Sequence, residues 1–165
     1  MRAYLPATTG VLRTLLDSGS TGPAPLTAFA VTPALREWYV DDDAESLEYA
    51  AMSEAARASL RLIDADESAA RRRVVVAVDI PDANVAVRDD LDRGVVQLTE
   101  AVPLTAVASV HVDDADAADT VAVAAAAMLA ADLGDVGSQE RVDDAEGFEL
   151  SWYATQEIEH LLGTL

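Results

Sequence analysis

The segment "RRRVVVAVDIP" at residues 71–81 constrains the fold more than any other part of the chain. Val74 to Val78 are apolar at both alternating sets of positions, and three arginines precede them. Successive side chains of a β-strand point to opposite faces of its sheet. A strand without polar alternation is therefore buried on both faces. We expect this strand at the centre of a sheet that is covered on both sides.

Other segments alternate or cluster apolar residues in the manner of strands. They are "RAYLP" at 2–6, "LTAFAVT" at 26–32, "VVQLTEAV" at 95–102, "AVASVHVD" at 106–113 and "FELSWYA" at 148–154, with a small additional strand at 85–87. In the last of the main segments, Phe148, Leu150 and Trp152 share one face, so we interpret Trp152 as a core residue.

Helix start and stop signals lie between these strands. The expected helices run from Thr8 or Thr9 to Gly19, from Thr32 and Pro33 through "LREWY", from about Ala44 to Ile63, from Asp113 or Asp114 to Gly134, and from Thr155 through "TQEIEHLL". The run "DDD" at 41–43 separates the second helix from the third. The segment "GDVGSQ" at 134–139 is interpreted as the exit from the fourth helix.

The order of these elements mixes helical crossovers with directly linked strands. We therefore predict a mixed β-sheet of about six strands covered by helices, in the α+β class, with α/β as the alternative. No internal repeat or long low-complexity linker divides the chain, so residues 1–165 are expected to form a single globular domain.

The charge of the chain restricts its partners. The formal net charge is −19, from 30 acidic residues and 11 arginines without a single lysine. Such a chain repels nucleic-acid phosphate and anionic lipid, so we expect neither nucleic acid nor membrane as a partner. The longest charge-free run of the alanine-rich region, Thr120 to Ala131, is too short to span a bilayer. The lack of cysteine and of a signal-peptide core at the start favours a cytoplasmic protein.

His111 and Asp113 are the candidates for a catalytic or metal site. Two residues apart on an expected strand, they share a face and could form a metal pair or an oriented general base. A catalytic zinc site commonly takes three protein ligands, so a third would have to come from another element. Asp114, Asp116 and Asp119 are better explained as acids of a helix N-terminus. Ser109 shares the face of His111, but we expect the two side chains to be too far apart for a hydrogen bond.

A second group of candidates could bind a ligand. Guanidinium groups suit carboxylate or phosphate ligands, and aromatic side chains often anchor interfaces. The candidates are Arg57, Arg61, Arg71, Arg72 and Arg73, together with Trp38 and Tyr39. The alternative for the arginines is that they neutralise neighbouring acids.

Several segments together resemble a family of small acidic actinobacterial proteins classed as a domain of unknown function. They are "MRAYLPAT", "AVTPALREWY", "YAAMSEAARASLRL", "RRRVVVAVDIP", "ASVHVDD" and "WYATQEI". The resemblance covers nearly the whole chain and carries no catalytic motif. It implies an actinobacterial, cytoplasmic origin and no established activity.

The sequence thus favours a non-enzymatic cytoplasmic binding or protein-interaction protein that needs no cofactor. Its expected contact features are "LREWY", "WYATQE" and the arginine cluster. One alternative is a metal-assisted hydrolase that uses His111 and Asp113. The other is a binder of small anionic molecules that uses the arginine cluster.

Overall fold

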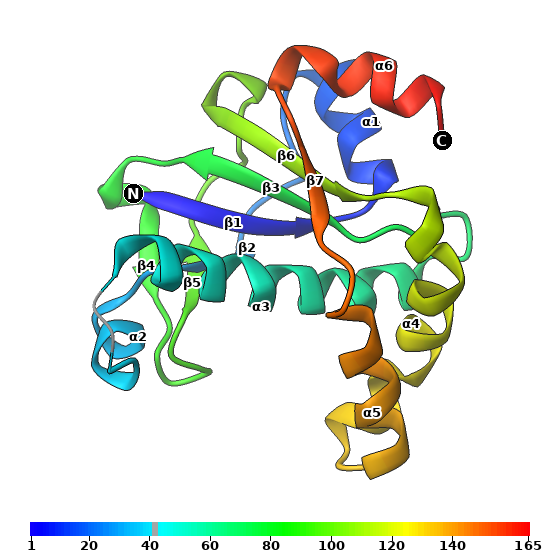
Figure 1. Cartoon of the computed structure of the whole chain (residues 1–165). Coiled ribbons are helices and arrows are strands. Elements are labelled where there is room, and N and C mark those ends of the chain that lie inside the picture. Colours follow the sequence, from blue (N-terminus) through cyan, green and yellow to red (C-terminus); the bar gives the residue numbers. More distant parts are fainter. Residues whose placement is uncertain (41–42) are drawn as a thin grey trace.

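An antiparallel sheet with helices against both faces makes up the computed structural model, which describes residues 1–40 and 43–165 (Figure 1). Within these residues the strand order is β4-β5-β2-β1-β3-β6-β7, and every neighbouring pair is antiparallel. The strands are β1 (Arg2–Ala7), β2 (Leu26–Ala30), β3 (Val74–Asp79), β4 (Val85–Val87), β5 (Val95–Leu98), β6 (Val107–Asp113) and β7 (Leu150–Tyr153).

The helices within the described residues are α1 (Thr9–Ser18), α2 (Pro33–Trp38), α3 (Ala44–Ala65), α4 (Ala118–Asp132), α5 (Val136–Ala145) and α6 (Ile158–Gly163). Single 3₁₀ turns cover Asp82–Asn84, Leu104–Ala106, Ala115–Ala117 and Thr155–Glu157. The expected signals act at α1 and α2: Gly19 ends α1 with φ of 76°, and the Thr32 hydroxyl accepts a hydrogen bond from the Leu35 amide. Most of the predicted "DDD" interruption, residues 41–42, lies outside the described residues.

The α+β prediction is confirmed, and so is the interior position of β3, which pairs with β1 and β6. Val74 to Val78 are all buried. The prediction of a mixed sheet was wrong, because the strands of the described residues run antiparallel throughout. The connections through α1 and through the α4–α5 hairpin return the chain to the end of the sheet where it left. The connection through α2 and α3 carries the chain to the opposite end, but β3 then pairs antiparallel with β1 instead of parallel with β2.

Two apolar layers cover the sheet. On one face, α1 and α6 pack through Leu12, Leu15, Ile158 and Leu161. On the other face, α3 packs against β1, β2 and β3. The buried face of α3 runs from Leu47 and Ala51 to Leu60 and Ile63. Ser59 adds a polar link, since its buried hydroxyl donates to the Ala7 carbonyl (2.7 Å) and accepts from the Val74 amide (3.1 Å).

The helices α4 and α5 form a hairpin that projects from one end of α3 (Figure 1). Its buried residues are mostly alanines, and Leu60 and Ile63 of α3 pack against them. The sequence analysis missed α5, which begins at the cap Asp135 whose carboxylate accepts from the Ser138 amide (2.9 Å).

Candidate functional site

Asp113 lies in the interior and binds Arg73, not His111. Its side chain is fully buried, and that of Arg73 is 3% exposed. The Arg73 guanidinium donates from Nε to Oδ2 (2.8 Å) and from Nη2 to Oδ1 (2.7 Å), and the Arg73 amide also donates to Oδ2 (2.8 Å). Arg73 Nη2 further donates to the Phe148 carbonyl (2.9 Å). The pair therefore joins β3, β6 and the segment that leads into β7.

A metal site at His111 and Asp113 would need a third ligand, and none is found among the described residues. Among residues 1–40 and 43–165, no three His, Asp or Glu side chains lie where they could hold a metal ion together. Both oxygens of Asp113 already accept charge-assisted hydrogen bonds from Arg73. Asp113 thus has a structural role in the fold.

His111 is hydrogen-bonded to Ser109, with 3.1 Å between Nε2 and the Ser109 Oγ. The expectation that these side chains are too far apart was wrong. Both point to the α3 side of β6, and the length of the imidazole spans the distance between alternate residues of the strand. Of the described residues, only Ser109 is hydrogen-bonded to the ring, so the arrangement lacks the orienting acid of a catalytic triad.

The five arginines of the predicted ligand site do not converge. Arg57 binds Asp143 and Glu146, and Arg61 forms a two-point pair with Asp132. Arg71 and Arg72 donate to the backbone carbonyls of Ile63, Asp66 and Asp113. Arg73 is the buried partner of Asp113. The arginines thus join α3 to the α4–α5 hairpin and fix the start of β3.

The two tryptophans are equally exposed, at 61% each. Trp38 ends α2, next to the exposed Tyr39, and the Arg93 guanidinium lies 3.4 Å from the centroid of its ring. The interpretation of Trp152 as a core residue was wrong. Trp152 lies on β7, the last strand of the sheet, and α3 packs over β1, β2 and β3 instead.

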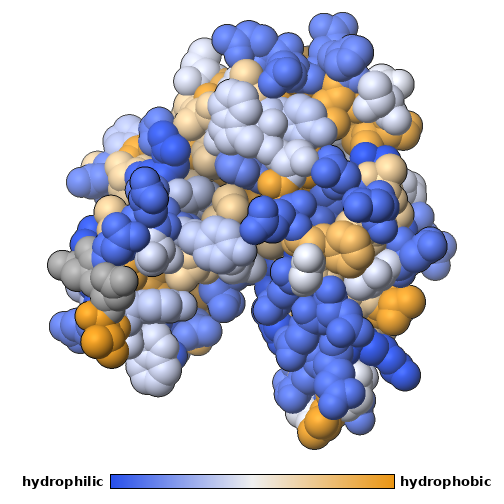
Figure 2. All heavy atoms as spheres, in the orientation of Figure 1, coloured by the Kyte–Doolittle hydropathy of each residue, from blue (hydrophilic) through white to orange (hydrophobic). Residues whose placement is uncertain are grey.

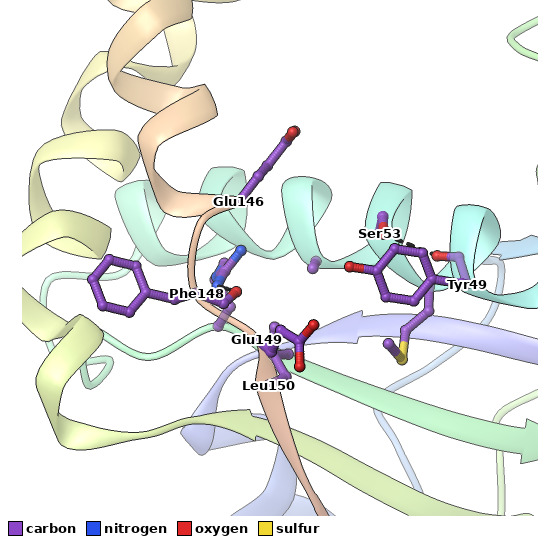
Figure 3. Close-up of a pocket in the computed structure, with 9 residues that line it drawn as sticks. Tyr49, Ser53, Glu146, Phe148, Glu149 and Leu150 are labelled. Atoms are coloured by element: carbon purple, nitrogen blue, oxygen red, sulfur yellow. Dashed lines mark hydrogen bonds between the residues drawn. The ribbon is translucent and has the colours of Figure 1, made fainter. Parts of the chain in front are cut away.

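A groove runs between α3 and the β6–β7 end of the sheet, and we call it the α3 groove. It consists of three adjoining hollows of about 270, 290 and 620 Å³ that share Tyr49. The first lies between α3 and the segment that joins α5 to β7 (Figure 3), and it is lined by Tyr49, Met52, Ser53, Ala56, Arg73, Glu146, Phe148, Glu149 and Leu150.

The second hollow continues over β6 and β7. Tyr49 and Met52 also line it, together with Tyr4, His111 and Trp152. The third adjoins the other two at Tyr49 and extends along α3 toward Tyr39 and Glu54. Tyr49 is 56% exposed at the junction. In Figure 3, the carboxylate of Glu149 is directed to the side of the strand on which Tyr49 lies. Sequence analysis had not singled out Tyr49 or Met52, because on a helix they are indistinguishable from core residues.

A model of a family of unknown function, DUF6912, matches residues 1–162. The chain belongs to this family. The match confirms the resemblance to a domain of unknown function, whereas the actinobacterial source stays a prediction. No curated protein and no solved structure matches the chain significantly. None of the helices in the described residues combines the length and the hydropathy that crossing a bilayer requires.

The α3 groove of this DUF6912 chain carries excess negative charge, and hydrophilic side chains cover most of the neighbouring α5 surface (Figure 2). Of the described residues, the carboxylates that line it are Asp43, Glu45, Glu48, Glu54, Glu146 and Glu149. The arginines that line it are Arg2 and Arg73, and each is bound to an aspartate outside the lining, Asp79 or Asp113. Partial loss of hydration, together with the nearby Asp92 carboxylate, raises the pKa of Glu54. Arg57 is paired with Glu146, and the remaining carboxylates leave the groove negatively charged beside exposed aromatic rings.

We expect His111 to make the stability of this DUF6912 chain depend on pH. Partial burial, and to a smaller extent the Arg2 guanidinium, lower the pKa of His111 below its usual 6.5. The unfolded chain then takes up a proton more readily than the folded chain, so the free energy of unfolding falls as the pH drops below 6.5. We expect His111→Gln to reduce this decline in urea titrations between pH 7.5 and 5.5. The exposed His160 provides the control: His160→Gln should keep the decline, and equal slopes for wild type and His111→Gln would contradict the prediction.

Proposed function

We propose that this chain is a non-enzymatic binding protein whose α3 groove holds a basic segment of a partner protein. The observation that carries the proposal is that, among the described residues, exposed aromatic side chains and carboxylates without an arginine partner line the same groove. Tyr49 and Trp152 are both more than half exposed, and Glu45 and Glu48 line the same hollow as Trp152.

Each part of the groove suits a cationic side chain with an aliphatic stem. Aromatic faces attract ammonium and guanidinium groups, and carboxylates form charge-assisted hydrogen bonds with them. Among residues 1–40 and 43–165, no arginine lies within ion-pair distance of Glu48 or Glu149. The net charge of −19 also accelerates the approach of a basic partner. We place this activity in the cytoplasm, where a chain without cysteine suits the reducing conditions.

The two alternative functions have less support. A metal-assisted hydrolase needs Asp113 as a ligand or base, but the Asp113 carboxylate is bound to the Arg73 guanidinium. An anion binder needs free guanidinium groups, whereas Arg57, Arg61 and Arg73 are all paired with carboxylates. A basic segment instead binds to the carboxylates of the α3 groove that are not paired with an arginine of the described residues.

Charge reversal within the groove tests the proposal. The probe is an acetylated heptapeptide of alternating arginine and threonine, and Trp38→Phe leaves Trp152 as the single fluorescent tryptophan. We expect the peptide to change the Trp152 emission. The double variant Glu48→Lys/Glu149→Lys should weaken binding about tenfold, because two attractive contacts of roughly 0.2–1 kcal/mol each become repulsive.

The matched control is Asp17→Lys/Glu100→Lys, which makes the same change in net charge at exposed sites that do not line the groove. It should keep the affinity within about threefold, a change of less than 1 kcal/mol. Equal weakening in both double variants would show attraction to the net charge alone. That result, or no binding of the arginine peptide by the wild type, would overturn the proposed function.

A further inference from the structure

The outer edge of β7 is open. This strand ends the sheet and pairs on one side with β6, from Val110–Tyr153 to Asp113–Leu150. Within the described part of the chain, the backbone of Leu150 to Tyr153 has no hydrogen-bond partner other than β6. An open edge presents a row of N–H and C=O groups that can pair with another strand. The sequence "LSWY" contains neither the proline nor the charged residues that usually protect such an edge.

The side chains of β7 alternate between the groove and the opposite face. Leu150 and Trp152 pair with Asp113 and His111, which are on the α3 side of the sheet. Ser151 and Tyr153 pair with Val112 and Val110, which belong to the core under α1 and α6. A strand added beside β7 would lie about 4.8 Å away and continue this alternation. Every second side chain of the added strand would then reach the side of the sheet where the α3 groove lies.

We infer that the basic partner segment binds in extended form, as a strand added to the outer edge of β7. This inference rests on the proposed function and specifies its geometry. Backbone hydrogen bonds to β7 hold the segment, and alternate basic side chains lie beside Trp152 and the carboxylate of Glu149. In strand addition of this kind, backbone hydrogen bonds provide affinity and the alternate side chains provide specificity.

The charge around β7 favours a basic segment over a second copy of this chain. Glu149 directly precedes β7, and Glu157 follows it, where its carboxylate accepts from the Ala154 amide (2.7 Å). Two copies paired edge to edge would bring these carboxylates together, in addition to the repulsion between two chains that each have a net charge of −19. A basic segment would instead meet opposite charge at both ends of the strand.

Two isomers of the arginine–threonine heptapeptide test this geometry. One carries N-methyl groups on the arginine residues and the other carries them on the threonine residues. In an extended strand, alternate N–H groups point to opposite sides, so only one isomer loses the donors that face β7. We expect that isomer to bind about tenfold more weakly than the parent peptide, and the other to bind within about threefold of it. Which isomer fails indicates whether the added strand is parallel or antiparallel to β7.

Amide hydrogen exchange supplies a second measurement. On binding the parent peptide, alternate amides among Leu150, Ser151, Trp152 and Tyr153 should gain protection, because only the amides that face outward acquire a new acceptor. If both N-methylated isomers bind like the parent and these amides gain no protection, the strand-addition geometry is overturned while the proposed groove function stands. If the parent peptide does not bind to the wild type, the proposed function fails as well.

Discussion

Replacing Asp113 by alanine should lower the free energy of unfolding by about 3–5 kcal/mol, the usual cost of breaking a buried ion pair by removing one partner. The cost arises at Arg73, whose guanidinium is 3% exposed and would remain charged in the interior without its carboxylate. The Arg73 guanidinium would keep only the hydrogen bond to the Phe148 carbonyl. Urea denaturation followed by circular dichroism at pH 7 measures the loss.

The exposed pair of Arg61 and Asp132 is the matched control for this substitution. Its geometry is similar, with both hydrogen bonds at 2.8 Å, but its side chains are 47% and 36% exposed. Asp132→Ala should therefore cost only about 0–1 kcal/mol. The double variant Arg73→Met/Asp113→Ala should regain part of the loss, since no charge is left buried. Equal losses in Asp113→Ala and Asp132→Ala would contradict the structural role of the buried pair.

Replacing Ile63 by alanine should cost about 2–5 kcal/mol, the range for removing a large buried aliphatic side chain. Ile63 is fully buried where α3 meets the α4–α5 hairpin, and most of its partners there are alanines, such as Ala124 and Ala131. Small side chains on well-packed helices cannot move far enough to fill the space that Ile63 leaves. The neighbouring Leu62 is 39% exposed, and Leu62→Ala is expected to change the stability by only about 0.5 kcal/mol.

Hydrogen exchange would show where the stability is lost in Ile63→Ala. The amides of α4 and α5 should exchange much faster than in the wild type, because Ile63 belongs to the apolar contact between the hairpin and α3. The amides of β1 and β3 should keep more of their protection. If Leu62→Ala destabilises the protein as much as Ile63→Ala, the packing argument is wrong.

Local sequence patterns predicted the positions of helices and strands better than they predicted the order of the strands in the sheet. The apolar run from Val74 to Val78 placed β3 in the interior, because a strand that is buried on both faces is apolar at every position. The pattern of β7 gave no such indication. Phe148, Leu150 and Trp152 alternate as in a covered strand, but their exposure depends on strand order. β7 lies at the end of the sheet, past the strands β1, β2 and β3 over which α3 packs.

The candidate site was predicted in part. His111 does line the groove, as a conspicuous histidine on a strand face had suggested. Its expected partner Asp113 instead binds a residue 40 positions away in the sequence, and spacing within one strand cannot indicate such a contact. Tyr49 and Met52 follow the periodicity of an ordinary helix, so only the packing of α3 against the sheet shows that they border an open groove.

The order of strands in the sheet has a consequence for synthesis of the chain on the ribosome. β1 and β3 can pair, and α3 can cover one of their faces, before β6 has been made. The 27 residues between Asp79 and Val107 take about 1–5 s to translate. During that interval the edge of β3 that later pairs with β6 exposes an apolar stretch of high β-propensity, Val74 to Val78. The guanidinium groups of Arg71, Arg72 and Arg73 directly precede this stretch, and charges in that position act as gatekeepers against association of nascent chains.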